Sequence, residues 1–268
     1  GYQSVMAIPY DYPVVGYGIL NGGSASSYFD YKKNVAFNPQ YFEICQKEFS
    51  LIEKSGKNRS KGLVPAYLNE DSTPGACFIE LKMRSLLIEI LRYQQLTGTK
   101  PQQLLPLFQM TSIYNNQEMA EAYQLFKNSL YLQELVSETG VEITKVLTGV
   151  QPMLAAYTHS CLGRPKEIFT NAYGIENTPL PMPGGHGQNF EILRDCYQEL
   201  LQRGIKLIYL GNVDNLGFTV NPIAIALLAL QGKQAGFEFS FRTVVDVKGG
   251  VLVLDQNNKL NCADLGVA

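Results

Sequence analysis

The chain contains the stretch Gly211-Asn212-Val213-Asp214-Asn215-Leu216-Gly217, between an apolar run at 206–210 and an apolar, helix-like segment at 222–230. A short apolar run suits a buried strand, so the stretch is expected where a strand ends. Open α/β sheets bind ligands at the carboxyl ends of their strands, where a carboxylate can hold a metal and a phosphorylated ligand. An Asp between two Asn residues is also ordinary turn chemistry, so Asp214 alone leaves both interpretations open.

A second candidate segment follows the strand-like run at 14–20. It reads Asn21-Gly22-Gly23-Ser24-Ala25-Ser26-Ser27, a loop of small residues whose backbone N–H groups an anion can approach closely. The loop is therefore a candidate phosphate site, with a plain tight turn as the alternative. It has neither the Gly-Lys-Ser/Thr ending of a Walker loop nor the G-x-G-x-x-G of a dinucleotide fingerprint.

The third segment, Pro183-Gly184-Gly185-His186-Gly187-Gln188, carries one of the two histidines of the chain. Glycine on both sides gives His186 little packing from its neighbours. This setting favours an imidazole that contacts a ligand over a core histidine. His159 lacks such a setting and is assigned to structure or surface.

These three blocks and Asp246-Val247-Lys248-Gly249-Gly250 occur in the order and context of one family. The chain resembles the UDP-sugar pyrophosphorylases, most closely the UTP–glucose-1-phosphate uridylyltransferases and their N-acetylhexosamine relatives. The resemblance implies a Rossmann-like nucleotide-diphospho-sugar transferase fold of the GT-A-like type, with three α/β layers and a mostly parallel sheet between helices on both faces. Strand-like and helix-like segments that alternate along the chain favour the same fold class.

The resemblance also implies a reaction. The phosphate oxygen of a sugar 1-phosphate attacks the α-phosphorus of UTP, pyrophosphate leaves and a UDP-sugar forms, with Mg²⁺ as cofactor. Such a transfer needs positioning and charge neutralisation rather than a covalent nucleophile. By their places in the motifs, Asp214 would bind Mg²⁺, the nucleotide would contact Leu20, Asn21, Gly22, Gly23, Gln151 and Gly185, and the sugar phosphate would contact His186, Asn212 and Asn215.

The family also places a Lys after the glycine loop, where it neutralises the triphosphate. We assign it to Lys61, because residues 78–87 resemble the helix that follows this Lys in the family. Lys61 and Asp214 are then the expected catalytic residues, and residues 31–60, approximately, are an insertion. A Lys in a polar loop is usually solvated, so this assignment leaves other cations open. The competing residues are Lys32, Lys33, Lys57 and Arg59.

Departures from the family pattern keep other functions open. Ala25 stands where the family loop has Gly, and its methyl group would crowd a phosphate. A late catalytic Lys and the C-terminal β domain of the family would fall beyond Ala268. We therefore expect a single nucleotidyltransferase-like catalytic domain over 1–268, either shortened or from a reduced family member. The alternatives are a nucleotide-sugar-binding module that has lost the loop chemistry and a GT-A-type glycosyltransferase with Asp214 as its metal ligand.

Composition argues against several other classes of protein. A formal net charge of −2 and a pI near 5.8 do not suit a broad nucleic-acid surface. Five widely spaced cysteines without a C-x-x-C pair favour reduced thiols over disulfides or a zinc site. Without a secretory leader or an apolar run of membrane-spanning length, we expect no membrane partner and a cytoplasmic location. The identity of the sugar and the oligomeric state stay open.

Periodicity predicts the approximate order of elements. Strands are expected at 14–20, 104–110, 142–147, 206–210, 237–245 and 251–254, and helices at 78–96, 117–130, 190–203 and 222–230. Alternating acids and bases at 80–92 are interpreted as a solvated helix face. Gly140, Gly204 and Gly236 are expected to end elements.

Overall fold

The computed structural model describes residues 12–23, 28–101, 103–158, 165–241 and 250–264. Its main sheet has four parallel strands in the order β3-β2-β1-β6. The strands are β1 (Val15–Leu20), β2 (Leu107–Ser112), β3 (Leu147–Gln151) and β6 (Leu207–Asn212). Because the four strands run in the same direction, their carboxyl ends meet at one edge of the sheet.

The order of the strands reverses beside β1. From β1 the chain proceeds to β2 and β3 on one side, and β6 lies on the other side of β1. Loops leave a sheet in opposite directions at such a reversal, and the crevice between them is where open α/β sheets bind ligands. Here the two loops are those that follow Leu20 and Asn212, which pair directly across β1 and β6.

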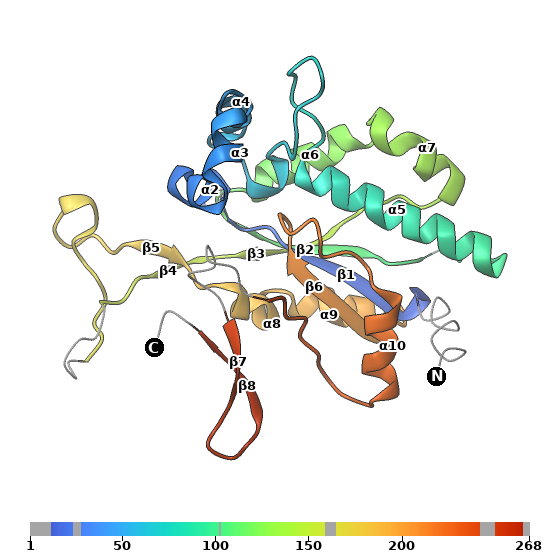
Figure 1. Cartoon of the computed structure of the whole chain (residues 1–268). Helices are drawn as coiled ribbons and strands as arrows, with labels where there is room; N and C mark the ends of the chain where they lie inside the picture. Colours follow the sequence, from blue (N-terminus) through green and yellow to red (C-terminus); the bar gives the residue numbers. More distant parts are fainter. Residues whose placement is uncertain (1–11, 24–27, 102, 159–164, 242–249, 265–268) are drawn as a thin grey trace.

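Helices cover both faces of the sheet (Figure 1). One face carries α5 (Phe78–Thr97), α6 (Asn116–Phe126) and α7 (Leu130–Thr139), and the other carries α8 (Asn189–Ile192) and α9 (Arg194–Gln202). Neighbouring residues in a strand point to opposite faces, so Leu107 belongs to the core cluster around α5 and Phe108 to the cluster around α9. The predicted parallel α/β sheet between helices is confirmed.

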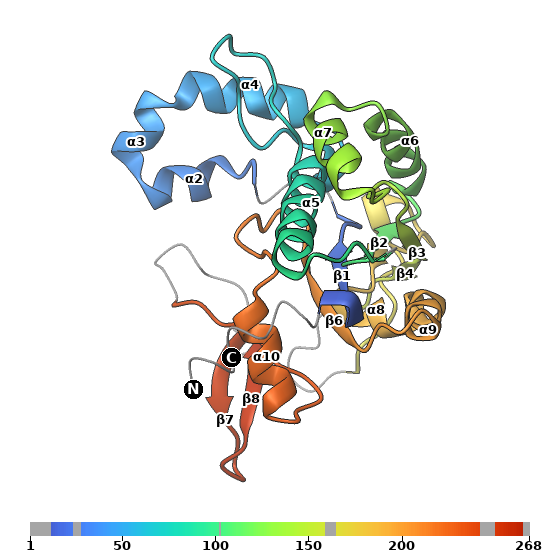
Figure 2. The same ribbon diagram turned by 90° about the vertical axis from the view of Figure 1, so that its right-hand side faces the viewer.

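The remaining elements lie around this sandwich. α2 (Tyr31–Phe37), α3 (Pro39–Ile44) and α4 (Gln46–Gly56) form an arm that extends away from the sheet (Figure 2). Antiparallel pairs are formed by β4 (Met153–Ala155) with β5 (Pro181–Pro183) and by β7 (Gly250–Leu254) with β8 (Leu260–Asp264). The short 3₁₀ turns are η2 (Lys61–Leu63), η3 (Ala172–Gly174) and η4 (His186–Gln188).

The helix after β6 begins and ends where its sequence predicts. In α10 (Pro222–Leu230), the side chain of Asn221 accepts hydrogen bonds from the backbone N–H groups of Ile223 and Ala224. Such a cap satisfies donors that a first turn leaves unpaired, and Pro at the first helical position loses nothing by lacking an N–H. Among the helices that the structure describes, none has both the length and the apolar character needed to cross a membrane.

Two predicted strands are displaced along the chain. The strand expected at 142–147 lies at Leu147–Gln151, because Ile143 is buried in the core from a turn and mimics the apolar alternation of a strand. The strand expected at 104–110 begins at Leu107. Pro106 precedes it and has no N–H to donate to a ladder, which explains the later start.

Other predicted boundaries also need correction. The helix expected at 117–130 ends at Phe126, and a separate helix, α7, follows it. The region 31–60, expected to be a polar insertion, is largely helical. Residues 237–241 contain no strand, and the rest of that predicted strand lies outside the described residues. Gly140 does end a helix, with the positive φ of 71° that favours glycine at this position.

Candidate functional site

The loops after β1 and β6 bring two of the predicted segments together. The backbone N–H of Val213 donates to the carbonyl of Leu20 at 3.3 Å, which joins the loops at their start. Gly22 and Gly23 follow on one side and Asp214 on the other. The predicted phosphate loop and the predicted metal ligand therefore lie at the reversal of strand order, where a ligand crevice is expected.

Lys61 lies at the same place although it is distant in sequence from both loops. Its Nζ is 2.8 Å from Oδ1 of Asp214, and the two side chains are only 15% and 21% exposed. Its backbone N–H donates to the carbonyl of Gly23 at 3.2 Å. Within the described residues, Lys61 is the candidate cation that forms an ion pair with Asp214, whereas Lys32 and Lys33 lie in α2 of the arm.

A buried polar network holds the glycine loop against η2 and β2. The side chain of Asn21 is fully buried, accepts from the N–H of Gly62 at 3.0 Å and donates to Oε1 of Gln109 at 3.2 Å. The carbonyl of Asn21 accepts from Nδ2 of Asn115 at 2.6 Å. Asn21 thus positions the loop through these hydrogen bonds. Its predicted contact with a nucleotide stays a prediction.

The segment that carries Lys61 is also held from α6. Oε2 of Glu118 accepts from the backbone N–H of Ser60 at 3.0 Å and from its hydroxyl. Hydrogen bonds to a carboxylate are stronger than those between neutral groups, so Glu118 ties η2 firmly to the helix. The sequence analysis missed Glu118, because an acid in the first turn of a helix is common for its interaction with the helix dipole.

Gln151 connects the two glycine-rich segments. It ends β3, is 3% exposed, and donates through Nε2 to the carbonyl of Gly185 at 2.9 Å and to Oε1 of Gln188 at 2.8 Å. A Cβ built on Gly22 would lie 3.5 Å from its Oε1. The predicted uracil-reading residue therefore lies between the two predicted nucleotide segments.

His186 lies close enough to the Lys61–Asp214 pair for both charges to act on it. His186 is exposed at the surface, but desolvation by the surrounding protein and the positive charge of Lys61 lower the pKa of the imidazole, while the carboxylate of Asp214 raises it, and the net effect is a pKa below the ordinary value. The ring is therefore neutral at pH 7. A neutral imidazole can donate one hydrogen bond and accept another.

Asn212 and Asp214 offer oxygen ligands at the end of β6. Oδ1 of Asn212 is buried and has no hydrogen-bond partner among the described residues, which is uncommon for a buried amide oxygen. No group of three or more His, Cys, Asp or Glu side chains suited to a metal occurs in the described part of the chain. Mg²⁺ prefers oxygen ligands and is often held by one or two carboxylates with substrate phosphates, so this donor set fits Mg²⁺.

The predicted solvated face of the 80–92 helix is wrong at Lys82. Lys82 is 2% exposed, and its Nζ donates to the hydroxyl of Tyr17 at 3.2 Å and to the carbonyls of Asn215 and Phe218 at 2.5 Å each. Burial lowers the pKa of this ammonium to about 8. The signal was present in the sequence, since Lys82 falls three residues after Ile79 on the apolar stripe of α5.

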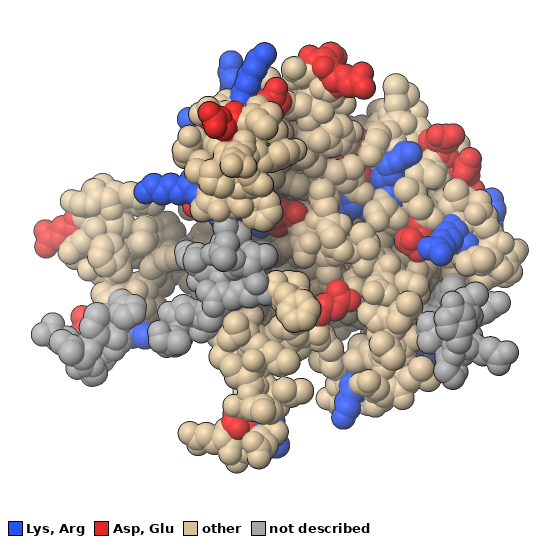
Figure 3. Space-filling view, viewed as in Figure 1, with Lys and Arg blue, Asp and Glu red and all other residues tan. Residues whose placement is uncertain are grey.

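Some predicted features cannot be placed. Ala25, His159 and the motif residues 246–249 lie outside the described residues. Charged side chains on the face shown in Figure 3 are scattered, with both signs interspersed. This distribution agrees with the formal net charge of −2.

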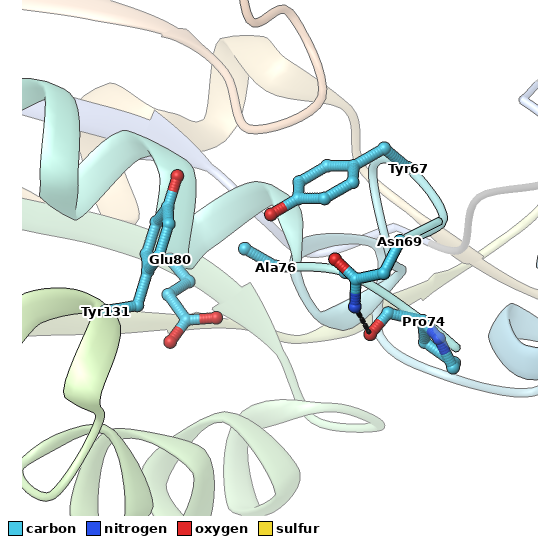
Figure 4. A pocket seen from close by; sticks show the side chains of 7 residues that line it. Tyr67, Asn69, Pro74, Ala76, Glu80 and Tyr131 are labelled. Carbon is cyan, nitrogen blue, oxygen red and sulfur yellow. Dashed lines mark hydrogen bonds between the residues drawn. The ribbon is translucent and has the colours of Figure 1, made fainter. Parts of the chain in front are cut away.

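A separate shallow recess of about 350 Å³ lies on the α5–α7 side of the molecule. Figure 4 shows Tyr67, Glu80 and Tyr131 around it, and the remaining lining residues are Asn69, Pro74, Gly75 and Ala76. None of the residues predicted for catalysis or ligand binding lines this recess. The candidate site is instead the group of loops at the carboxyl ends of the strands, where Lys61 and Asp214 meet.

Comparison with known proteins gives a family and a set of similar folds. The family model for UTP–glucose-1-phosphate uridylyltransferase matches residues 75–266. A structure described as a UDP-N-acetylglucosamine pyrophosphorylase from Entamoeba histolytica has 17% sequence identity and a TM-score of 0.63, and the match covers 99% of this chain and 55% of that one. The uridine diphosphate N-acetylglucosamine pyrophosphorylase of Trypanosoma brucei has 18% identity and a TM-score of 0.61, over 98% of this chain and 44% of that one.

A further structure, the UDP-glucose phosphorylase of Trypanosoma brucei, has 19% identity and a TM-score of 0.54, over 94% of this chain and 42% of that one. No curated protein matches the chain. The chain spans about half the length of the two N-acetylglucosamine pyrophosphorylases. At these identities the likeness shows the fold, and the predicted Rossmann-like fold is confirmed.

Proposed function

The chain belongs to the UTP–glucose-1-phosphate uridylyltransferase family, and from this we propose that it forms a UDP-sugar and pyrophosphate from UTP and a sugar 1-phosphate. The observation that carries the proposal is the Lys61–Asp214 ion pair at 2.8 Å, at the reversal of strand order. A cation that could neutralise phosphate and a carboxylate that could bind a metal thus lie beside the loop of Gly22 and Gly23, and this supports the proposal. These are the parts that a phosphoryl-type transfer needs.

In the proposed reaction, an oxygen of the sugar phosphate forms a bond to the α-phosphorus of UTP. The bond from that phosphorus to the bridging α–β oxygen breaks, and its electron pair leaves with pyrophosphate. The transfer needs no oxidant and no covalent enzyme intermediate. Its rate depends on how well the two phosphates are aligned and how well the charge on the leaving group is neutralised.

The residues at the carboxyl ends of the strands would divide this work between them. Lys61 would neutralise the triphosphate, because an ammonium forms strong hydrogen bonds to phosphate oxygens. Gln151 would bind the edge of the uracil ring, and the neutral His186 would donate a hydrogen bond to the sugar phosphate. Asp214, with Asn212 as a further oxygen donor, would hold Mg²⁺, which when bound supplies positive charge to the phosphates.

The binding-module alternative would use the same residues without turnover, and Ala25 in the glycine loop is the observation that favours it. The glycosyltransferase alternative would consume a UDP-sugar and release UDP in place of pyrophosphate. Glucose 1-phosphate and N-acetylglucosamine 1-phosphate are both candidates for the second substrate, since structures with either type of name share the fold.

Isothermal titration and a pyrophosphate-release assay test the proposal. The purified chain is titrated with UTP, UDP-glucose and UDP-N-acetylglucosamine, with and without Mg²⁺. Pyrophosphate release is then measured with UTP and either glucose 1-phosphate or N-acetylglucosamine 1-phosphate. We expect binding and pyrophosphate release with one sugar phosphate. Binding without release would support the binding module, and no binding of any uridine nucleotide would overturn the proposal.

Matched variants identify the residues. Asp214→Asn should remove Mg²⁺-dependent turnover. Because the amide keeps the size of the side chain but no longer pairs with the ammonium of Lys61, we expect only a small loss of thermal stability, on the order of 1 kcal/mol. Lys61→Ala should weaken UTP binding by about 10–100-fold, the effect of losing a hydrogen bond to a charged group. Lys33→Ala removes the same charge from α2 and serves as the control. If Lys33→Ala has the larger effect, Lys61 is not the triphosphate lysine.

A further inference from the structure

Lys82 is a buried cation that the reaction described above does not use. Its ammonium carries three N–H donors, and each has an acceptor, namely the hydroxyl of Tyr17 and the carbonyls of Asn215 and Phe218. The side chain also lies over the rings of Tyr17 and Phe218, at 5.8 and 5.7 Å from their centroids. Burying a charge is costly, so a lysine at this position needs a reason beyond filling space.

Two of the three acceptors belong to the loop that carries Asp214. Asn215 is the next residue along the chain, and Phe218 closes the loop. The ring of Phe218 stacks on Tyr209 of β6, with centroids 4.4 Å apart, and occupies the space where a Cβ on Gly211 would lie. Lys82 therefore binds the loop after β6 at two places, Asn215 and Phe218, and this loop folds back over β6.

The third acceptor connects this loop to β1. The hydroxyl of Tyr17 accepts from Lys82 and itself donates to the carbonyl of Phe218 at 2.6 Å. Tyr17 lies on the strand that leads to Gly22, and it is 1% exposed. The ammonium thus joins α5, β1 and the loop after β6 at one point.

We propose that Lys82 is a positioning residue that fixes the Asp214 loop so that the carboxylate lies opposite Lys61 before any ligand binds. The inference deepens the proposed function and rests on it for the meaning of Asp214. Mutation of a group that orients a metal-binding side chain typically lowers affinity or activity about 10–100-fold. The charge of Asp214 is close enough to Lys82 to favour the protonated ammonium, which agrees with this geometry.

Amide hydrogen exchange on the ligand-free chain tests the positioning role directly. In Lys82→Met, which keeps the length of the stem but has no donor, we expect the amides of residues 213–219 to exchange at least about tenfold faster than in the wild type, as loss of a hydrogen bond to a charged group would cause. Gln94→Met is the matched control. It removes another buried hydrogen bond from α5, between Nε2 of Gln94 and the carbonyl of Thr139 at 2.8 Å.

Milder variants keep the test valid if Lys82→Met does not fold. Tyr17→Phe removes only the hydroxyl between Lys82 and Phe218, and it should loosen residues 213–219 to a smaller extent. Lys82→Arg keeps a charged donor, so it should restore most of the protection lost in Lys82→Met. Unchanged exchange at 213–219 in Lys82→Met, or in Tyr17→Phe if the former is unfolded, would overturn the proposal. The proposal would also be overturned if Gln94→Met accelerated amide exchange at residues 213–219 as much as Lys82→Met does.

Titration with UTP and Mg²⁺ separates this inference from the proposed function. If the wild type binds, Lys82→Met should bind about 10–100-fold more weakly, Lys82→Arg should recover part of the loss, and Gln94→Met should bind as the wild type does. Unaltered affinity in Lys82→Met would count against the positioning role. If the wild type does not bind, the proposed function fails, and the exchange rates at 213–219 alone decide whether Lys82 holds the loop.

Discussion

Gly62→Ala provides a sharp test of how Lys61 is held. A Cβ on Gly62 would lie 2.7 Å from Oδ1 and 2.9 Å from Nδ2 of Asn21, and contacts this short cannot persist. Asn21 cannot simply turn away, because it is fully buried and bonded to the N–H of Gly62 and to Gln109. The substitution must therefore displace either the buried amide or η2 with Lys61.

The cost follows from these contacts. Overpacking a buried site costs about 1–3 kcal/mol, and leaving a buried polar group without its hydrogen bond costs about 1–3 kcal/mol, so we expect a loss of about 2–6 kcal/mol in the free energy of unfolding. At about 2–4 °C per kcal/mol for a chain of about this size, that corresponds to a fall in Tm of about 4–24 °C. Displacement of Lys61 should also weaken UTP binding about 10–100-fold, although no charge is changed.

Thermal unfolding by circular dichroism and titration with UTP measure the two effects. Gly236→Ala is the control for the general effect of replacing glycine, because the nearest atom to its Cβ would be Cδ1 of Leu228 at 3.5 Å, an ordinary contact. If Gly62→Ala keeps a Tm within about 1 °C of the wild type and of Gly236→Ala, the Asn21 network does not constrain η2 as described.

Two further predictions follow from buried polar groups. Glu118→Ala should lower the free energy of unfolding in urea by about 1–3 kcal/mol and weaken UTP binding, because Ser60 loses its carboxylate partner. Glu121→Ala on the same helix is the control. If the urea unfolding midpoints of Glu118→Ala and Glu121→Ala are equal, the prediction is contradicted. For Lys82, the pKa is about 8 in the folded chain against an ordinary 10.5, so between these pH values the unfolded chain binds more protons and stability rises with pH. Between pH 8 and pH 10.5, the free energy of unfolding of the wild type should therefore rise by at most about 3 kcal/mol more than that of Lys82→Met. If urea unfolding shows the same pH dependence for both proteins, this prediction is wrong.

The family and the fold class could be predicted from the sequence. The glycine segments and the Asp214 stretch are local patterns, and a parallel sheet follows from the alternation of strands and helices. The carboxyl ends of parallel strands lie at one edge, so segments that follow strands could be assigned to one site. Boundaries were less predictable, as the displaced strand at Leu147–Gln151 shows, because a buried turn at Ile143 gives the same apolar pattern.

The sequence by itself determined which residue types lie at the carboxyl ends of the strands, because each motif directly follows its strand in the chain. Only the tertiary structure decided which cation meets Asp214, since Lys61 and Asp214 come together through the packing of η2 against the glycine loop. It also decided that Lys82 faces inward to carbonyls more than a hundred residues away. Local periodicity records which face of a helix is buried, whereas the partner on that face depends on how distant segments pack.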